Sequence, residues 1–296
     1  MTEQFGAQVE QQRVAPVAAV AAAGDDPAMA LTERVAPVAP VAAPANISSD
    51  GAMVRLRGEG YKEVKLTAIS SLSQAPVPAT RRGYAPSAPE PRLSAHSYQA
   101  GLWDADEFAA HQYVEGLRRQ VGQTATLTSV NDGAPWIRRV TATNFPTATL
   151  ILDWHHAEER LQVVADYAFS NPATQREWCA TTTEQLWQGQ LQAVVTALDD
   201  LGLTADSAAP DLVRHSPGSF QNTADATDSP AYRALGLPLG SGTVESAANT
   251  LVHHRMRRQG PGWNRDAGHA MLAALSELHS DRFERAWADS QPALAP

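Results

Sequence analysis

Three acidic residues lie in distinctive short motifs that are far apart in the sequence. Asp50 stands in Ser-Ser-Asp-Gly-Ala-Met-Val, Asp132 in Ser-Val-Asn-Asp-Gly-Ala-Pro-Trp, and Glu245 in Leu-Gly-Ser-Gly-Thr-Val-Glu-Ser-Ala. Carboxylate oxygens are the ligands that hard cations such as Mg²⁺ prefer. Two such ions about 3.5–4 Å apart can hold both the attacking and the leaving oxygen of a phosphoryl transfer. The three acids are therefore candidate metal ligands and candidate catalytic residues.

Each acid also has a simpler interpretation. Asp132 follows an asparagine and precedes a glycine, which is ordinary turn chemistry. Glu245 follows a Gly-Ser-Gly turn and opens a helical pattern, where a negative charge favours the helix N-terminus. Asp50 is less easily explained, because the residues after it are apolar and β-prone and acidic residues are depleted in strands. From the residues alone a metal-binding role is favoured for Asp50, whereas the turn is the stronger interpretation of Asp132.

Two further stretches accompany the three acids. Ile-Leu-Asp-Trp-His-His-Ala at 151–157 carries Asp153 and His156, and a second distinctive stretch runs from Tyr232 through Trp263. Taken together, these motifs resemble the DDE transposases of bacterial insertion sequences, specifically the ISKra type within the Mutator-like superfamily. Asp153 and His156 match that superfamily's Asp-x-x-His signature. The motifs stand in the family's order, and the resemblance covers most of the chain, from about Ile47 to Trp287.

The resemblance implies an α/β fold of the RNase H-like kind, a mixed sheet flanked by helices with a helical insertion before the last catalytic acid. In that fold the first and fourth strands lie side by side, so Asp50 and Asp132 come together. The resemblance further implies that two Mg²⁺ or Mn²⁺ ions, held by Asp50, Asp132 and Glu245, support DNA strand cleavage and strand transfer of an insertion sequence. Asp153 and His156 are expected to support that site. We expect element ends and target DNA as partners, and a homo-oligomer on DNA.

Two alternatives stay open. One is a degenerate, non-catalytic DNA-binding remnant that keeps the fold, and the other is an RNase H-like nuclease without strand transfer. Members of this type commonly carry an extra N-terminal region, so the chain is expected to be shortened at its front. Leu275 stands where relatives often have arginine. A zinc site is not favoured, because Cys179 is the single cysteine and zinc ribbons need several.

A basic tract is the candidate for contact with the DNA backbone. The net charge is −9 and the sequence pI is about 5.4, so the chain as a whole lacks the basic footprint of a nucleic-acid binder. Arginine suits phosphate because its planar group offers several donors, and an aromatic ring can stack on an unpaired base. The alternative is a solvated helix C-terminus, where cations complement the dipole. The candidate residues are Arg255, Arg257, Arg258, Trp263 and Arg265.

The chain divides into three parts. Residues 1–45 are rich in alanine, valine and proline and contain Arg-Val-Ala-Pro-Val-Ala twice. Because proline stops helices from propagating, we expect a linker or disordered tail. A short helix over 3–12 is an option. Residues 46–287 are the expected catalytic domain, with the helical insertion at about 157–230, and 288–296 a tail. No apolar run approaches the ~20 residues of a membrane span, and the first residues lack the positive charge of a secretion signal. A cytoplasmic location with no membrane contact is expected.

Hydrophobic periodicity predicts the elements within the domain. Alternation predicts strands over 52–56 and 64–68, and a continuous apolar run predicts a strand over 147–152. Further strands are expected over 97–100 and 124–130. Helical spacing predicts helices from about 104 to 117, from 157 to 168 and from 187 to 201, and a final pair over 244–258 and 265–278. Residues 70–96 and 203–230 are rich in small and polar residues and are expected to be loops.

Overall fold

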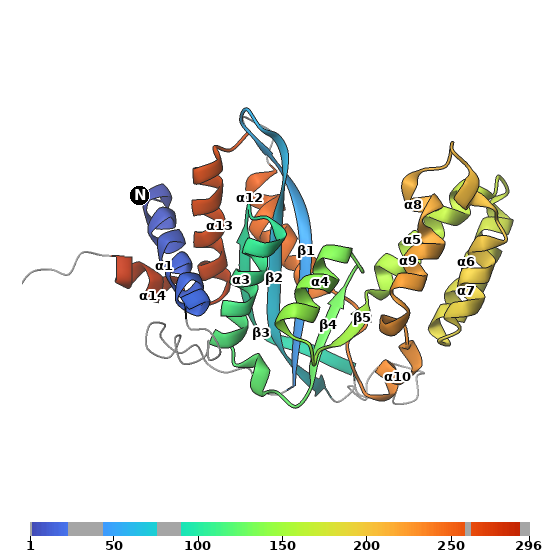
Figure 1. Cartoon of the computed structure of the whole chain (residues 1–296), viewed down its shortest axis with the longest axis horizontal. Helices are drawn as coiled ribbons and strands as arrows, with labels where there is room; N and C mark the ends of the chain where they lie inside the picture. Colours follow the sequence, from blue (N-terminus) through green and yellow to red (C-terminus); the bar gives the residue numbers. More distant parts are fainter. Residues whose placement is uncertain (1, 23–43, 76–89, 258–261, 291–296) are drawn as a thin grey trace, which may run out of the picture.

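A five-stranded mixed sheet is the centre of the structure. The computed structural model describes residues 2–22, 44–75, 90–257 and 262–290. The sheet is open, with the order β3-β2-β1-β4-β5 (Figure 1). Neighbouring strands β1, β2 and β3 are antiparallel, whereas β4 is parallel to β1 and β5 is parallel to β4. The predicted α/β class with a mixed sheet is confirmed. The strands are β1 Ala45–Leu56, β2 Gly60–Ala75, β3 Glu90–Gly101, β4 Leu127–Asn131 and β5 Thr149–Leu152.

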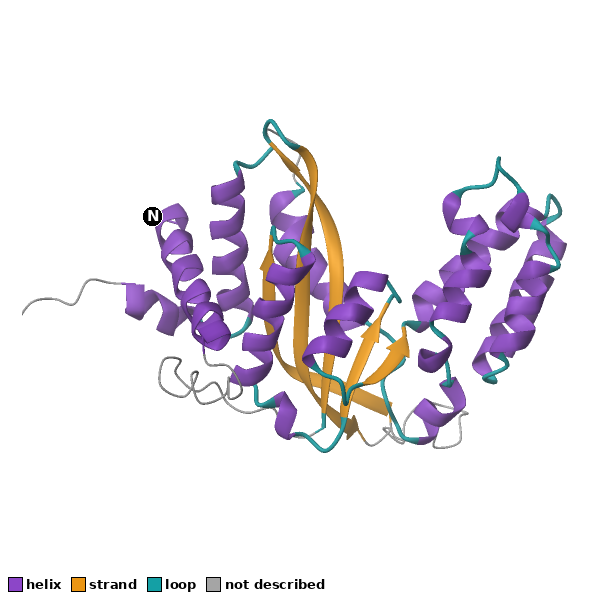
Figure 2. Ribbon diagram, in the orientation of Figure 1, coloured by secondary structure: helices purple, strands orange, loops and turns teal. Residues whose placement is uncertain are grey.

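Helices cover the sheet and fill the connections after β3, β4 and β5 (Figure 2). No helix in the described ranges is long and apolar enough to cross a membrane. The α-helices are α1 Thr2–Ala22, α3 Ala105–Arg118, α4 Pro135–Asn144, α5 Trp154–Ala168, α6 Pro172–Trp187, α7 Leu191–Asp199, α8 Asp211–Arg214, α9 Ser216–Asn222, α10 Ser229–Ala234, α11 Gly242–Ala247, α12 His254–Met256, α13 Arg265–His279 and α14 Phe283–Ser290. Three short 3₁₀ turns, η1 Val121–Gln123, η2 Leu203–Ala205 and η3 Ala224–Ala226, and a π-helical turn, η4 Ala248–His253, complete the set.

The two faces of the sheet are covered by different helices. From Ala52 to Leu56 every second residue of β1 is buried, as the alternation of the sequence predicts, whereas the residues from Ala45 to Ser49 are all buried. Val54 and its neighbours on that face form one apolar cluster with Val244 and Leu251 from α11 and η4. On the opposite face Ile47 packs with Phe145, which follows α4. Asp50 has the same parity as Val54, so it lies on the face that α11 covers.

A separate group of helices, here called the helical lobe (α5 to α9), lies beside the β5 edge of the sheet (Figures 1 and 2). Its own apolar cluster includes Leu161 from α5, Val194 from α7 and Phe220 from α9. Helices occupy 154–234 between β5 and α11, where the sequence predicts an insertion at about 157–230. The expectation of a polar loop over 203–230 is wrong, because short helices there bury apolar residues such as Phe220.

The long helix predicted from Trp187 to Leu201 is also wrong. Trp187 is the last residue of α6, and α7 begins only at Leu191. Gly189 between them has φ +72°, a left-handed conformation that disfavours other residues and ends a helix. The apolar spacing continues through the break because both helices bury one side in the same cluster.

The N-terminal segment differs from the expectation of a linker or disordered tail. Residues 2–22 form α1, which packs chiefly against α13; residues 23–43 lie outside the described residues, and so does the tail beyond Ser290. Phe5, Val9, Arg13 and Ala19 are buried along one side of α1. Pro16 is accommodated within the helix. Tertiary contacts with the C-terminal helices therefore override the helix-breaking tendency of the composition.

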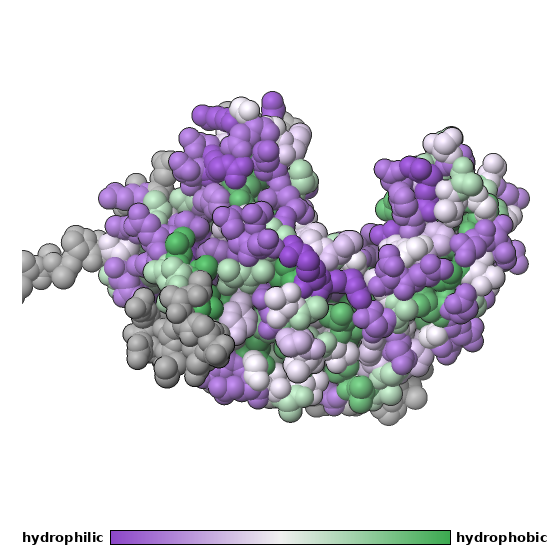
Figure 3. All heavy atoms as spheres, viewed as in Figure 1, coloured by the Kyte–Doolittle hydropathy of each residue, from purple (hydrophilic) through white to green (hydrophobic). Residues whose placement is uncertain are grey.

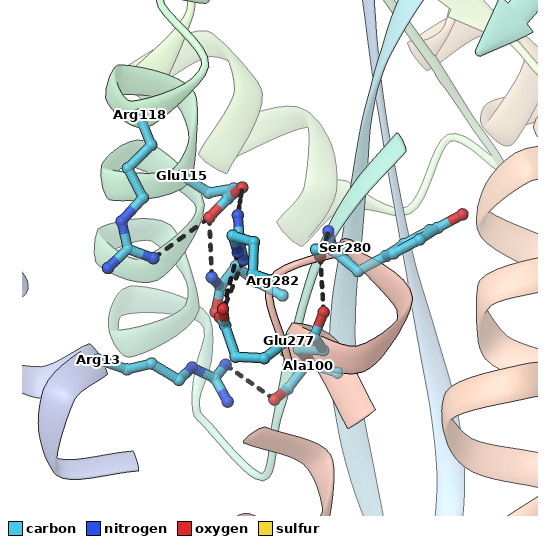
Figure 4. Close-up of polar contacts among 10 residues, drawn as sticks. Arg13, Ala100, Glu115, Arg118, Glu277, Ser280 and Arg282 are labelled. Atoms are coloured by element: carbon cyan, nitrogen blue, oxygen red, sulfur yellow. Dashed lines mark hydrogen bonds and ion pairs between the residues drawn. The ribbon is translucent and has the colours of Figure 1, made fainter. Parts of the chain in front are cut away.

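Buried charged residues fasten α3 to the C-terminal helices beneath α1 (Figure 4). Arg282 donates to Glu115 at 2.7 Å and to Glu277 at 2.8 Å. Burial alone would raise the pKa of Glu115, but the charges of Arg282 and Arg118 outweigh it and hold that pKa at about 2. Arg13 from α1 donates to the carbonyl of Ala100 at 3.0 Å. The network thus ties α1, α3, β3 and the C-terminal residues into one unit.

Glu115→Gln should lower the free energy of unfolding by about 3 kcal/mol, because it leaves the buried Arg282 without one of its two charged partners. The exposed Glu177→Gln in α6 is the matched control and should change stability little. Urea unfolding at neutral pH measures both. The contribution of ionised Glu115 to the free energy of unfolding is complete above its unfolded pKa of 4.5 and is lost as the pH falls through about 2. Equal stability of the two variants at pH 7 would contradict this role.

Candidate functional site

The register of the parallel strands sets three aspartates side by side. The β1–β4 ladder pairs Ile47 with Ser129, so three residues further along both strands Asp50 is level with Asp132. The β4–β5 ladder pairs Asn131 with Leu152, so the next residues, Asp132 and Asp153, are level as well. The backbone N–H of Asp153 donates to the Asn131 carbonyl at 2.8 Å and continues this pairing. Asp132 and Asp153 thus directly follow β4 and β5, and Asp50 lies level with them in the middle of the longer β1.

Asp50 experiences the charges of the other predicted acids. Burial raises its pKa to about 6, and the carboxylates of Asp132 and Glu245 add to that rise. The N–H of Gly51, which donates to Asp50 at 2.7 Å, and the charge of His156 act in the opposite direction. The structure therefore brings the predicted acids Asp50, Asp132 and Glu245 into one electrostatic cluster. Their mutual repulsion is what a bound cation would relieve.

The surrounding backbone fixes the positions of Asp132 and Glu245. Asp132 accepts the N–H of Ala134 at 2.9 Å, and Gly133 between them has φ +84°, so the chain turns sharply from β4 into α4. Glu245 lies in the first turn of α11 and accepts from the Ser241 hydroxyl at 3.3 Å. It is partly exposed, whereas the preceding Val244 is buried against the sheet. The glutamate therefore borders the face on which Asp50 lies.

Asp153 joins the start of α5 to the start of α11. Its side chain is fully buried. One carboxylate oxygen accepts the N–H of His156 at 2.9 Å, and the other accepts the N–H of Ser241. Burial would raise the pKa of Asp153, but these hydrogen bonds outweigh it and hold the pKa well below its usual range. Asp153 is therefore ionised and positions the loop that carries Glu245.

His156 is the cation of the cluster. Its Nδ1 lies 3.2 Å from Asp153 Oδ1 and 4.0 Å from Glu245 Oε1. The interaction with Asp153 is the largest cause that raises the pKa of His156, to about 9, and the charges of Asp132 and Glu245 contribute. The imidazole is therefore protonated at neutral pH. The predicted supporting pair, Asp153 and His156, does lie beside the predicted acids.

Asp153, His156 and Glu245 could also hold a metal ion, because each offers a ligand atom within 4.8 Å of the others. Such a site would require His156 to lose its proton, since metals bind the neutral imidazole. Asp153 would also have to share oxygens that already accept two backbone N–H groups. Asp50, Asp132 and Glu245 do not meet this spacing among the described residues, although the charges of Asp132 and Glu245 act on Asp50. Their donor chemistry differs as well, since three carboxylates suit a hard cation.

The predicted basic tract lies further along β1, beyond Asp50. Arg257 donates to the Met53 carbonyl at 2.8 Å, whereas Arg255 is exposed. Arg258 lies outside the described residues.

Two members of that tract are engaged within the fold. Trp263 pairs with β1 at Leu56 and packs against the apolar cluster, and its indole N–H donates to Met256 at 3.3 Å. Arg265 is ion-paired with Glu59 at 3.1 Å. Among the described residues of the tract, the exposed arginines are Arg255 and Arg257.

Two polar residues near the acids are absent from the sequence-based set. Asn131, the last residue of β4, accepts the N–H of Ser49 at 2.6 Å and holds β1 and β4 together just before Asp50 and Asp132. Arg160 lies one helical turn after His156 on α5, and the charge of Asp132 acts on it. Arg160 falls within the helix predicted over 157–168, one helical turn after His156, and this spacing is the signal that could have revealed it.

A cavity of ≈ 620 Å³ lies next to Asp132. It is lined by the turn after β4 and by residues of α5, α7, η2, α8 and α9. Figure 3 shows the molecular surface deeply hollowed between the part that contains the sheet and the helical lobe. The candidate acids therefore lie beside a space large enough for a ligand of nucleotide size.

Asp153→Asn should lower the free energy of unfolding by about 3 kcal/mol, because an amide nitrogen would face backbone donors or His156 in a buried position. Asp166→Asn is the matched control on the same helix, since Asp166 is exposed and accepts only from Gln162 among the described residues. Thermal and urea unfolding in the presence of a chelator measure the difference without any metal. An Asp153→Asn variant as stable as the control would show that the buried carboxylate does not position α11.

Alkaline pH should weaken the fold through His156. Its folded pKa of about 9 is above its unfolded value of 6.5, so its stabilising contribution is complete below about pH 6.5 and is lost as pH rises through about 9. The difference in unfolding free energy between the native chain and His156→Gln, measured from pH 6 to about 10, should shrink over this window. His155→Gln, next in sequence and largely exposed, is the control; a pH-independent difference for His156→Gln would contradict the assignment.

Comparison with known proteins adds no family assignment. No family model matches the chain, and no curated protein matches it. The assignment of the site therefore depends on its geometry and on the motifs of the sequence.

Proposed function

We propose that this chain is the catalytic core of a DNA transposase of the DDE type, with an RNase H-like fold. The observation that carries the proposal is the level arrangement of Asp50 and Asp132 on adjacent parallel strands, with Glu245 reaching their cluster from α11. Acids gathered in this way from two strands and a helix suit metal-dependent phosphoryl transfer. The sheet order supports the proposed fold, because β1 and β4, the first and fourth strands, are neighbours.

Asp50, Asp132 and Glu245 are the residues that would hold divalent ions, most suitably two Mg²⁺ or Mn²⁺ ions. The donor set fits, because all three offer carboxylate oxygens. The raised pKa of Asp50, at about 6, also fits, because its charged form lacks sufficient compensation within the protein. Ions bound there would supply charge neutralisation and an activated water to an in-line displacement at phosphorus.

Other residues of the chain would orient the substrate and compensate charge. Asp153 fixes the backbone that carries Glu245, through its bond from Ser241. The protonated imidazole of His156 lies near enough to the acids to stabilise additional negative charge on a phosphate group. In strand transfer the oxygen of a freed 3′ hydroxyl forms a bond to a target phosphorus while the bond to the neighbouring nucleotide breaks. That exchange depends mainly on positioning and charge stabilisation.

The proposed partners are the ends of a mobile element and target DNA. An acidic chain, with a net charge of −9, would bind DNA through local cations such as Arg255 and Arg257, because local charge matters more than the total at close range. Two element ends must be cut and joined together in transposition. We therefore propose that copies of this chain assemble as a homo-oligomer on DNA.

Metal-dependent strand cleavage tests the proposal. The purified protein should nick supercoiled DNA with Mg²⁺ or Mn²⁺ but not with Ca²⁺, which accepts looser coordination. Asp50→Asn, Asp132→Asn and Glu245→Gln should each lower the rate by at least about a hundredfold. Glu159→Gln, an exposed acid on α5, should retain the full rate. Nicking that persists undiminished in Asp50→Asn would exclude this site.

Stability measurements separate a lost metal ligand from a lost fold. Without metal, Asp50→Asn should melt at a higher temperature than the native chain at pH 7, because it removes a carboxylate whose ionisation is unfavourable above about pH 6. Mg²⁺ should then raise the melting temperature of the native chain but not of Asp50→Asn.

Supplying precleaved DNA ends distinguishes strand transfer from simple cleavage. Joined product would support the transposase, whereas nicking without joining would identify a nuclease. Binding of DNA without either reaction would favour a non-catalytic remnant.

A further inference from the structure

The charged walls of the cavity beside Asp132 include one arginine, Arg160, that is left without an ion pair in the described part of the chain. Arg160 from α5 and Arg214 from α8 line it, together with the acids Asp132 and Asp199. Among the described residues, no hydrogen bond or ion pair engages the Arg160 guanidinium. Arg214 pairs with Asp211 through one nitrogen, but its buried Nε has no hydrogen-bond partner within the described part of the chain. Both arginines line the same space, and Arg160 is the one whose guanidinium has no hydrogen bond or ion pair in the described part of the chain.

Arg160 is held in this position at a cost. Burial lowers its pKa, and only the charge of Asp132 opposes that effect. A half-buried guanidinium without a protein partner keeps its N–H donors available to water or to a ligand. Phosphate is the group that arginine's planar fork fits best, because two parallel N–H donors can reach two of its oxygens.

Neutral polar groups complete the walls. Thr204, Ser219, Gln221 and Asn222 line the cavity and offer hydroxyl and amide groups. Amides can both donate and accept, so they suit the edge of a base as well as a phosphate oxygen. The volume of ≈ 620 Å³ exceeds what a free inorganic anion needs and is within the range of about 300–1,000 Å³ found for larger ligands.

We propose that this cavity is a phosphodiester-binding subsite that takes the single-stranded DNA segment adjoining the reacting phosphate, with Arg160 and Arg214 as its phosphate contacts. Asp132 is shared by the cavity wall and the cluster of acids, so a strand that passes the acids continues directly into the cavity. The proposal rests on the proposed function, because it assigns the cavity to that reaction's substrate. The proposal gives the helical lobe a role in substrate binding, since the helices of the lobe supply the cavity wall opposite Asp132.

Gly218 offers a way to change the charge of the cavity without disturbing the fold. It lines the cavity, and a side-chain carbon added there would meet no atom within 4 Å. Its φ lies outside the left-handed region, so other residues are not strained there. Gly218→Asp therefore places a negative charge beside the proposed phosphate position, and Gly218→Asn is a neutral control of nearly the same shape.

The experiment measures binding of a short, fluorescently labelled single-stranded oligonucleotide to the full chain by anisotropy, in a chelator and over a range of salt. Arg160→Ala should weaken binding about tenfold, as expected when a charged hydrogen bond is removed. It should also reduce the slope of log affinity against log salt by about 0.7 for each phosphate that the variant no longer neutralises. Arg176→Ala, an exposed arginine on α6 outside the cavity, should leave both unchanged. Gly218→Asp should weaken binding, whereas Gly218→Asn should not.

Absence of oligonucleotide binding by the native chain, or native affinity in both Arg160→Ala and Gly218→Asp, would overturn the subsite. Melting curves identify any variant that fails to fold. If Arg160→Ala does not fold, the comparison of Gly218→Asp with Gly218→Asn still tests the subsite. Because binding is measured without divalent metal, the two proposals can fail separately. Arg160-dependent binding without any metal-dependent nicking would reject the transposase and keep the subsite. Nicking by the native chain together with unchanged binding in both cavity variants would reject the subsite alone.

Discussion

Carboxylates held close together repel one another, and the arrangement of this protein follows from the need to tolerate that repulsion. The parallel register of β1, β4 and β5 brings Asp50, Asp132 and Asp153 level, and α11 adds Glu245. Asp153 is stabilised by backbone donors and by His156. Asp50 has no comparable compensation, and its pKa rises to about 6. The negative charge of Asp153 is thus compensated within the fold, whereas that of Asp50 is not.

Asp50 lies in the middle of β1, which pairs with β2 on one side and with β4 on the other. Its backbone cannot move away from the neighbouring charges, so the unfavourable arrangement persists. Asn131 strengthens it by bonding to the backbone of Ser49 across the strand pair. A pre-formed geometry of this kind generally lowers the stability of the fold. The apolar clusters on both faces of the sheet supply the compensating stability.

Local patterns in the sequence predicted much of this structure, and long-range contacts account for what they did not. Alternation around Val54 and Leu66 revealed the first two strands, and the motifs around Asp50, Asp132 and Glu245 marked the acids that the fold brings together. The level register of Asp132 and Asp153 could not be predicted, because it depends on pairing between strands. The break at Gly189 was hidden by an apolar spacing that continues through it. Only a short helix over 3–12 was offered as an option for the segment that forms α1, because its alanine- and proline-rich residues become helical by packing against α13, more than 240 residues away in sequence.

That packing of α1 has a consequence for the order in which the protein is made. Phe5 packs against Phe283 and Trp287, with ring centroids 5.1 and 5.2 Å apart, so α1 acquires its apolar partners only when the C-terminal helices have been synthesised. At 5–20 residues per second this takes roughly 15 to 60 s. Until then Phe5 and Val9, which the finished fold buries, lack those partners. Docking of α1 is therefore among the last steps in the assembly of this fold.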